Sequence, residues 1–164
     1  MNIILIGFMG AGKSTVGKLF AKQKSMNYIE MDDLVLRKSK RSSISEIFAI
    51  DGELRFRELE MTIAKEVSGG NDTVISTGGG IVMNKINVDY LKKSGSVVYL
   101  KARFSTLERR LHGDTTRPLF QKKTEALSLY NLRSSLYESY ADHIIETDKR
   151  EVSDIVMSLK NIFV

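Results

Sequence analysis

The chain has 164 residues, no cysteine and a formal net charge of +5 from 25 basic and 20 acidic side chains. Its length fits one domain, and the lack of cysteine excludes a disulfide framework, a thiolate metal site and a cysteine nucleophile. The basic residues are spread along the chain rather than gathered in a patch, which argues against nucleic acid as a partner and favours small anions.

The N-terminal apolar run is short and has no basic flank. It fits neither a transmembrane helix nor a signal peptide. We therefore expect a cytoplasmic protein with no membrane partner, acting as a monomer.

Five short apolar runs predict strands, separated by segments with helical spacing. The runs are residues 3–6, 28–29, 73–75, 97–100 and 143–145. Because each run is continuously apolar rather than alternating, we expect a parallel sheet that is buried on both faces. The alternation of strands and helices predicts an α/β fold, a three-layer sandwich in which helices cover both faces of a central five-stranded parallel sheet.

Helix start signals and one polar segment complete the pattern. Capping boxes at residues 43–46 and 105–108 predict two helix starts, because the hydroxyl and the carboxylate satisfy N–H groups of the first turn. Residues 112–123 are polar and include Pro118, the one proline of the chain. We expect this segment to be a mobile lid within a single domain of residues 1–164.

Residues 7–14 read GFMGAGKS and match the phosphate-binding pattern G-x-x-x-x-G-K-[ST]. A predicted strand precedes the motif and a predicted helix follows it, which is the context that the pattern requires. Glycines let backbone N–H groups approach phosphates, and the helix directs its positive end at them. The motif predicts a nucleotide phosphate site made of Gly10, Ala11, Gly12, Lys13, Ser14 and Thr15.

Within that site, Lys13 would hold the β- and γ-phosphates and the Ser14 hydroxyl would ligate Mg²⁺. The motif alone does not separate ATPases, GTPases and small-molecule kinases. An acidic cluster, Glu30-Met31-Asp32-Asp33, follows the second predicted strand. Ligands of open α/β sheets bind beyond the carboxyl ends of the strands, so these carboxylates could hold the waters of Mg²⁺ or accept a proton. The alternative is a structural role in capping the next helix.

Further motifs follow in order along the chain. They are Glu30-Met31-Asp32, the segment DGELRFR at residues 51–57, Gly78-Gly79-Gly80, Arg117-Pro118, and Arg133 followed by Leu136-Tyr137. Together with the phosphate loop, this order and spacing resembles the shikimate kinase family along nearly the whole chain. The resemblance implies a fold like that of the nucleoside monophosphate kinases, ATP and shikimate as substrates, Mg²⁺ as the cofactor, and transfer of the γ-phosphoryl group to the 3-hydroxyl of shikimate.

The resemblance also implies roles for individual residues. Arg57 and Arg133 would bind the carboxylate of shikimate, and Asp32 would orient or deprotonate the attacking hydroxyl. The catalytic set would be Lys13, Asp32 and Arg117. The remaining roles fall to Gly78, Gly79 and Gly80 at the substrate ring, Arg117 over the phosphates, Arg110 and Lys149 near adenine, and Ser14 with Glu30 (through water) at the metal. The family has Asp where this chain has Glu30, whose side chain reaches one methylene further.

Alternatives to these roles remain open on the sequence alone. Arg57 could pair with Glu53 and Glu60 on a helix surface. Arg133 shares a helical stripe with apolar and aromatic residues, which indicates a face turned inward. Gluconate or another small molecule could be the acceptor, and a non-catalytic nucleotide-binding module is the rival from a different class.

Two alignments compete for the substrate aspartate. Counting forward from Lys13 selects Asp32, whereas counting backward from Arg57 selects Asp33. The chain thus carries one extra residue, which loops accept more readily than packed elements. We place it in the segment Ser39-Lys40-Arg41-Ser42, choose Asp32, and expect Asp33 to be a helix cap.

Overall fold

The computed structural model describes residues 1–112 and 122–164. Its centre is a five-stranded sheet in the order β2-β3-β1-β4-β5, and every neighbouring pair is parallel. The strands are β1 (Asn2–Ile6), β2 (Asn27–Glu30), β3 (Thr73–Ser76), β4 (Gly95–Lys101) and β5 (His143–Glu146). The predicted parallel sheet of five strands is confirmed.

Eight helices and two short turns occupy the described residues. The helices are α1 (Lys13–Lys24), α2 (Met31–Ser39), α3 (Ile44–Glu46), α4 (Gly52–Val67), α5 (Lys85–Ser94), α6 (Phe104–Arg110), α7 (Lys123–Tyr140) and α8 (Val152–Ile162). A π-helical turn, η1 (Ile47–Asp51), precedes α4, and a 3₁₀ turn, η2 (Ile81–Met83), precedes α5.

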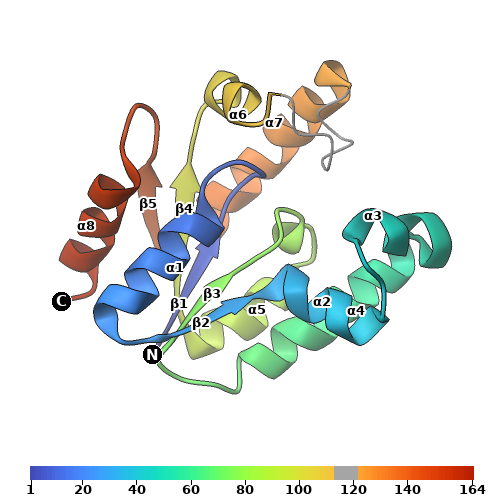
Figure 1. The fold of residues 1–164 in the computed structure, drawn as a ribbon, viewed down its shortest axis with the longest axis horizontal. Helices are drawn as coiled ribbons and strands as arrows, with labels where there is room; N and C mark the ends of the chain where they lie inside the picture. The colour runs from blue at the N-terminus through green and yellow to red at the C-terminus, as the bar shows by residue number, and fades with distance from the viewer. Residues whose placement is uncertain (113–121) are drawn as a thin grey trace.

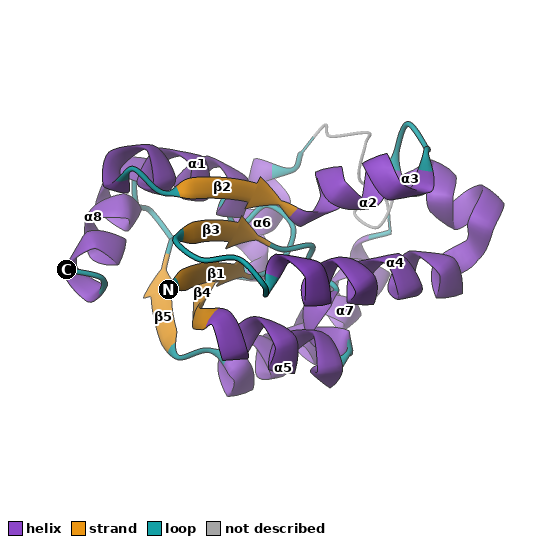
Figure 2. Ribbon diagram, turned by 90° about the horizontal axis from the view of Figure 1, so that it is seen from below, coloured by secondary structure: helices purple, strands orange, loops and turns teal. Residues whose placement is uncertain are grey.

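Helices cover the sheet on both faces, as the sequence predicted. Figure 2 shows α1 and α8 on one side of the strands and α5 on the other. In Figure 1, α6, the start of α7 and the α2–α3 segment lie beyond the carboxyl ends of the strands. The segments that carry the candidate site residues therefore meet at this end of the sheet.

Burial follows the position of each strand in the sheet. All five residues of β1 are buried at the centre, together with all four of β3. The edge strands differ from the prediction of burial on both faces: β2 is only partly buried, and in β5 Ile144 is 47% exposed while Ile145 is 4% exposed. An edge strand lacks a neighbour on one side, and the helices that cover the central strands do not fully reach it.

One predicted capping box is largely as expected. Ser43 precedes α3, and its Oγ accepts a hydrogen bond from the N–H of Glu46 at 3.1 Å. The Glu46 carboxylate accepts the N–H of Ser42 at 2.7 Å, one residue earlier than the motif predicts. Both bonds satisfy donors at the helix start.

The prediction of a second capping box, at residues 105–108, is wrong. α6 begins at Phe104, ahead of Ser105, with Arg103 at the cap position and no capping by its side chain. The N–H of Arg103 instead donates to the Asp148 carboxylate, at 3.1 and 3.2 Å from its two oxygens. A residue distant in sequence supplies the acceptor here, and no local motif could reveal it.

Within the two described ranges, no helix is both long and apolar enough to traverse a lipid bilayer. The predicted lid, residues 112–123, lies outside the described residues except at its two ends.

Candidate functional site

The phosphate loop joins β1 to α1. Gly10 and Gly12 adopt φ angles of +80° and +95°, in the left-handed region that glycine tolerates best. Gly12 occupies the cap position of α1, so the loop leads directly into the helix N-terminus. Gly7 is constrained by space as well: a Cβ there would lie 2.8 Å from the carbonyl oxygen of Leu100. The glycines thus shape a backbone that can present N–H groups to an anion.

Lys13 is held against this loop. Its side chain is largely buried, and Nζ donates to the carbonyl oxygens of Gly7 at 2.7 Å and Phe8 at 3.1 Å. The Lys13 ammonium thus lies next to the loop, at the start of α1. Such a cation suits the β- and γ-phosphates of a nucleotide.

The two candidate aspartates differ in burial and in their neighbours. Asp32 lies in the first turn of α2, partly buried and beside the triple glycine, since a Cβ on Gly78 would lie 2.8 Å from Asp32 Oδ1. Asp33, the next residue, is exposed. The expectation that Asp33 caps the helix is wrong: α2 begins at Met31, Glu30 holds the cap position, and the Glu30 side chain makes no capping bond.

Arg57 lies on α4 and pairs with two carboxylates. Its guanidinium donates to Glu60 at 2.9 Å and to Glu53 at 3.4 Å. The expected alternative of helix-surface pairing is therefore present, but Glu60 is buried rather than on the surface. The same guanidinium faces the glycine turn, because a Cβ on Gly80 would lie 2.5 Å from Arg57 Nη1.

Glu60 was not anticipated as part of the site. Burial raises the pKa of its carboxyl, and the Arg57 guanidinium opposes that rise. Helical spacing places Glu60 on the apolar face of α4, four residues after Phe56 and three before Ile63. The sequence did not indicate that Asp32 would lie nearby, where its charge raises the Glu60 pKa further. Glu60 holds the Arg57 guanidinium near the glycine turn.

Arg133 projects from α7 toward the same turn. It is 7% exposed, and its Nε has no hydrogen-bond partner among the described residues. Burial lowers the pKa of this guanidinium, and the nearby Arg57 lowers it further. Its cation lies 5.9 Å from the centre of the Phe8 ring, and a Cβ on Gly79 would lie 3.5 Å from Nη1. A buried cation of this kind is costly unless an anion meets it.

Tyr137, one helical turn after Arg133 on α7, also contacts the glycine turn. Its side chain is fully buried, and its hydroxyl donates to the carbonyl oxygen of Gly79 at 2.5 Å. Burial raises the pKa of this phenol, so it remains a neutral donor. α7 thus contributes both the buried cation and a fixed hydrogen bond to the turn.

Two strand residues lie near the expected metal position. Glu30 Oε2 accepts a hydrogen bond from the Tyr28 hydroxyl at 2.5 Å. Burial and this bond raise the pKa of Tyr28, while the nearby Ser76 and Ser14 hydroxyls oppose the rise. Tyr28 was missed by the sequence analysis, although its spacing of two from Glu30 on a strand places both side chains on one face.

The residues expected near adenine lie together. Arg110 donates to the Gly10 carbonyl at 3.1 Å and to the Thr147 carbonyl at 3.0 Å, and so links the phosphate loop to the segment after β5. Lys149 is exposed in that segment, with a left-handed φ of 55°. Arg117, expected over the phosphates, lies outside the described residues.

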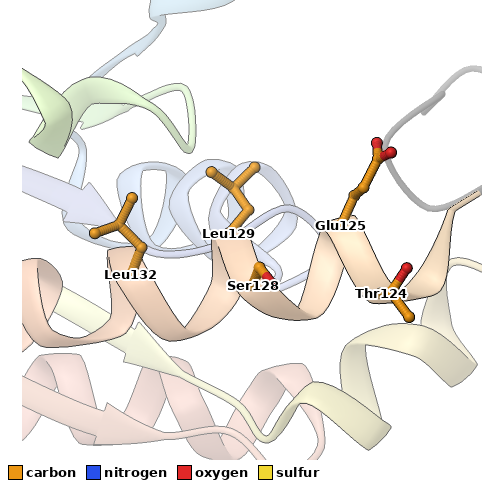
Figure 3. Close-up of a pocket in the computed structure, with 5 residues that line it drawn as sticks. All are labelled: Thr124, Glu125, Ser128, Leu129 and Leu132. Carbon is orange, nitrogen blue, oxygen red and sulfur yellow. The ribbon is translucent and has the colours of Figure 1, made fainter.

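A hollow of about 460 Å³ lies on one face of α7. Figure 3 shows its lining residues along the N-terminal half of the helix: Thr124, Glu125, Ser128, Leu129 and Leu132. None of them belongs to the phosphate loop or the glycine turn. The expected site is therefore built by convergent charged side chains rather than by this hollow.

Comparison with known proteins settles the family. A family model described as shikimate kinase matches residues 9–162. The chain belongs to the shikimate kinase family. A shikimate kinase from Caldicellulosiruptor saccharolyticus is 39% identical over 150 residues, which cover 90% of this chain and 86% of that protein. A shikimate kinase from Bacillus mycoides is 38% identical over 161 residues, with coverage of 97% and 96%.

Solved shikimate kinases share the fold. A structure of the Acinetobacter baumannii enzyme in complex with shikimate has a TM-score of 0.92 and 32% identity, covering 99% of this chain and 92% of that chain. The Aquifex aeolicus enzyme gives a TM-score of 0.88 at 32% identity, with coverage of 99% and 96%. The fold expected from the resemblance is confirmed.

Membership of the shikimate kinase family defines the reaction class. The chain is an ATP-dependent kinase that phosphorylates shikimate, a step of aromatic amino acid biosynthesis. Nothing in the comparisons favours gluconate as the acceptor or a non-catalytic nucleotide-binding module.

Proposed function

We propose that this shikimate kinase transfers the γ-phosphoryl group of ATP to the 3-hydroxyl of shikimate and releases ADP and shikimate 3-phosphate. The observation that carries the proposal is the buried Arg133, whose Nε has no partner among the described residues and which lies near Arg57 and the glycine turn. Two close guanidiniums, one of them buried, favour a carboxylate ligand.

Each residue then has a defined task. Arg57 and Arg133 bind the shikimate carboxylate, and Gly78, Gly79 and Gly80 contact the ring. Asp32, held beside Gly78, orients the 3-hydroxyl or accepts its proton. Lys13 stabilises negative charge on the transferring group, and Arg117 is proposed to do the same from its own segment.

The oxygen donors near the phosphate loop suit Mg²⁺. Ser14 offers a hydroxyl and Glu30 a carboxylate, and Mg²⁺ in kinases takes few protein ligands and fills its other positions with water and substrate phosphates. The described residues contain no group of three or more His, Cys, Asp or Glu that could hold a metal by itself. Mg²⁺ would neutralise charge between the β- and γ-phosphates.

The acceptor can be tested directly. Purified protein with MgATP is offered shikimate, gluconate or a nucleoside monophosphate in parallel, and ADP release is measured with the phosphorylated product identified by phosphorus NMR. We expect turnover with shikimate alone and phosphate on its 3-oxygen. Equal turnover with gluconate, or phosphate on another oxygen, contradicts the proposal.

Substitution of Arg57 or Arg133 should affect the KM for shikimate and not the KM for ATP. Arg57→Ala and Arg133→Ala should each raise the shikimate KM by roughly 10- to 150-fold, because a hydrogen bond to a charged group is worth about 1.5–3 kcal/mol. The ATP KM should change little. Steady-state kinetics with each substrate varied in turn measure both effects.

Arg55→Ala is the matched control for these two variants. Arg55 lies on the same helix as Arg57, and it pairs with Glu58 at 3.2 Å while more than half exposed. Surface pairs of this kind contribute little, so its kinetics should match those of the unchanged protein. Equal losses for shikimate and ATP in the Arg57 or Arg133 variant would assign those arginines a purely structural role.

Gly80→Ala should weaken shikimate binding by displacing the Arg57 guanidinium. The added Cβ would lie 2.5 Å from Arg57 Nη1, so the guanidinium has to move. We expect the shikimate KM to rise about 10-fold, the lower end of a charged hydrogen bond. At Gly70, by contrast, a Cβ would lie 3.6 Å from the nearest atom, an ordinary contact, and Gly70→Ala should leave the shikimate KM unchanged.

A further inference from the structure

Tyr28 has no role in the motifs or in the proposed mechanism, yet it contacts the expected metal site. Its hydroxyl donates to Glu30 Oε2 at 2.5 Å, and the two residues share one face of β2. The Ser14 hydroxyl lies within reach of the same phenol oxygen. Tyr28 therefore lies between the two residues that we assign to Mg²⁺.

The ring of Tyr28 is fixed by its packing against α1. A Cβ on Gly17 would lie 2.9 Å from Tyr28 Cε2 and 3.0 Å from Leu5 Cδ1, so only glycine lets the helix approach this closely. Lys18 Nζ lies 5.7 Å from the ring centre. Because the ring is fixed, the position of its hydroxyl is set by the packing of the helix on the sheet.

A glutamate such as Glu30 needs a fixed hydrogen-bond partner to hold its carboxylate in one place more than an aspartate would. A glutamate side chain has one more rotatable bond than an aspartate, and each additional rotor costs entropy when the carboxylate is held in one place. A hydrogen bond from a rigid phenol removes much of that freedom before any ligand binds. It occupies Oε2, and among the residues that the structure describes none is hydrogen-bonded to Oε1.

We propose that Tyr28 is a positioning residue for the Mg²⁺ site, which holds the Glu30 carboxylate so that its second oxygen meets the water shell of the cation beside Ser14. The inference rests on the proposed assignment of Ser14 and Glu30 to the metal. Partners that orient metal-binding groups typically affect metal affinity by about 10- to 100-fold when they are removed. Because Glu30 acts through water, we expect the lower end of that range.

The test measures nucleotide binding, without shikimate, by calorimetry. ADP is titrated into the unchanged protein and into Tyr28→Phe, once with Mg²⁺ and once with the metal chelated. Tyr28→Phe keeps the ring and removes only the hydroxyl. We expect MgADP to bind about 10-fold more weakly to the variant and metal-free ADP to bind equally to both. The Mg²⁺ concentration for half-maximal turnover should rise in parallel.

A double-mutant cycle with Glu30→Gln separates positioning from a general structural role. In the Glu30→Gln background, adding Tyr28→Phe should change MgADP affinity less than about 2-fold, because the partner it positions is already altered. Tyr90→Phe, which removes a phenol hydroxyl on α5, is the matched control and should leave MgADP binding unchanged. Thermal unfolding of each variant reports the loss of a structural hydrogen bond independently of Mg²⁺.

Three outcomes overturn the inference: unchanged MgADP binding in Tyr28→Phe, an equal loss for ADP with and without Mg²⁺, or the same loss in both Glu30 backgrounds. The binding measurement contains no shikimate, so failure of the proposed acceptor chemistry would leave it intact. A change in MgADP affinity for Tyr28→Phe with no change for Glu30→Gln would contradict the assignment of Glu30 to the metal, and with it the positioning role of Tyr28.

Discussion

Lys13→Ala should retain the fold and lose nearly all phosphoryl transfer. The variant removes the buried ammonium that contacts the carbonyl oxygens of Gly7 and Phe8 and that would meet the β- and γ-phosphates. Loss of one preorganised electrostatic group typically costs about 10²–10³-fold in kcat, and we expect at least the upper end because the substituted group carries a full charge.

The measurement is kcat from ADP release, with circular dichroism and thermal unfolding to confirm that the variant is folded. Lys22→Ala is the control, since Lys22 is exposed in the last turn of the same helix and lies away from the loop. It should keep normal kinetics. Near-normal turnover in Lys13→Ala would remove the phosphate loop from the mechanism.

Asp32→Asn should lower kcat by the ~10²–10⁴-fold typical of a lost general base or orienting carboxylate. Asp32 lies beside Gly78, near Glu60 and the substrate arginines, so an amide in its place would keep the shape and lose the charge. The expected effect is on kcat, with modest change in the KM for ATP. Single-turnover assays at saturating shikimate isolate the transfer step.

Asp33→Asn is the matched control for Asp32→Asn. Asp33 is exposed one position further along α2, so the same substitution there should be nearly silent. If Asp33→Asn is the more damaging change, then the register chosen by counting forward from Lys13 is off by one, and the extra residue lies before Asp33 rather than in the loop after α2.

The structure bears on where that extra residue lies. α2 ends at Ser39, and Lys40 adopts a left-handed conformation with φ of 58°, which glycine would accept at lower cost. The segment that we identified as the insertion point is therefore a loop, as the forward count requires. Arg41, next in the loop, pairs with Asp51 at 2.7 and 2.8 Å and ties this loop to the start of α4.

The parts of the fold that could be predicted are determined by residues close together in the sequence. Continuous apolar runs predicted all five strands, and the phosphate motif predicted the turn into α1, because these depend on residues adjacent in the chain. The wrong predictions depend on distant partners. Asp148 accepts the N–H of Arg103 at the start of α6, where the sequence predicted a local capping box at Ser105, and the π-helical turn at Ile47–Asp51 has no reliable local pattern.

In the candidate site, too, the residues in local motifs could be predicted and those that depend on packing could not. Motifs gave the identity of Lys13, Asp32, Arg57 and Arg133, and the structure brings the last three to one glycine turn. The burial of Glu60, the bond from Tyr137 to Gly79 and the bond from Tyr28 to Glu30 arise only when separate elements pack. Sequence reasoning therefore predicted the charged side chains that meet at the glycine turn better than the residues that hold them in place.

The position of β1 has a consequence for biosynthesis of the chain. β1 leaves the ribosome before the other strands, yet its partners in the sheet are β3, which begins at Thr73, and β4, which ends at Lys101. The first of these neighbours, β3, is complete only at Ser76. Such long-range pairing is slow and leaves the apolar side chains of β1 exposed in the meantime. The nascent chain should accordingly gain protection from proteases abruptly after β4 emerges, and a chaperone that covers the first strand should raise the yield of folded protein.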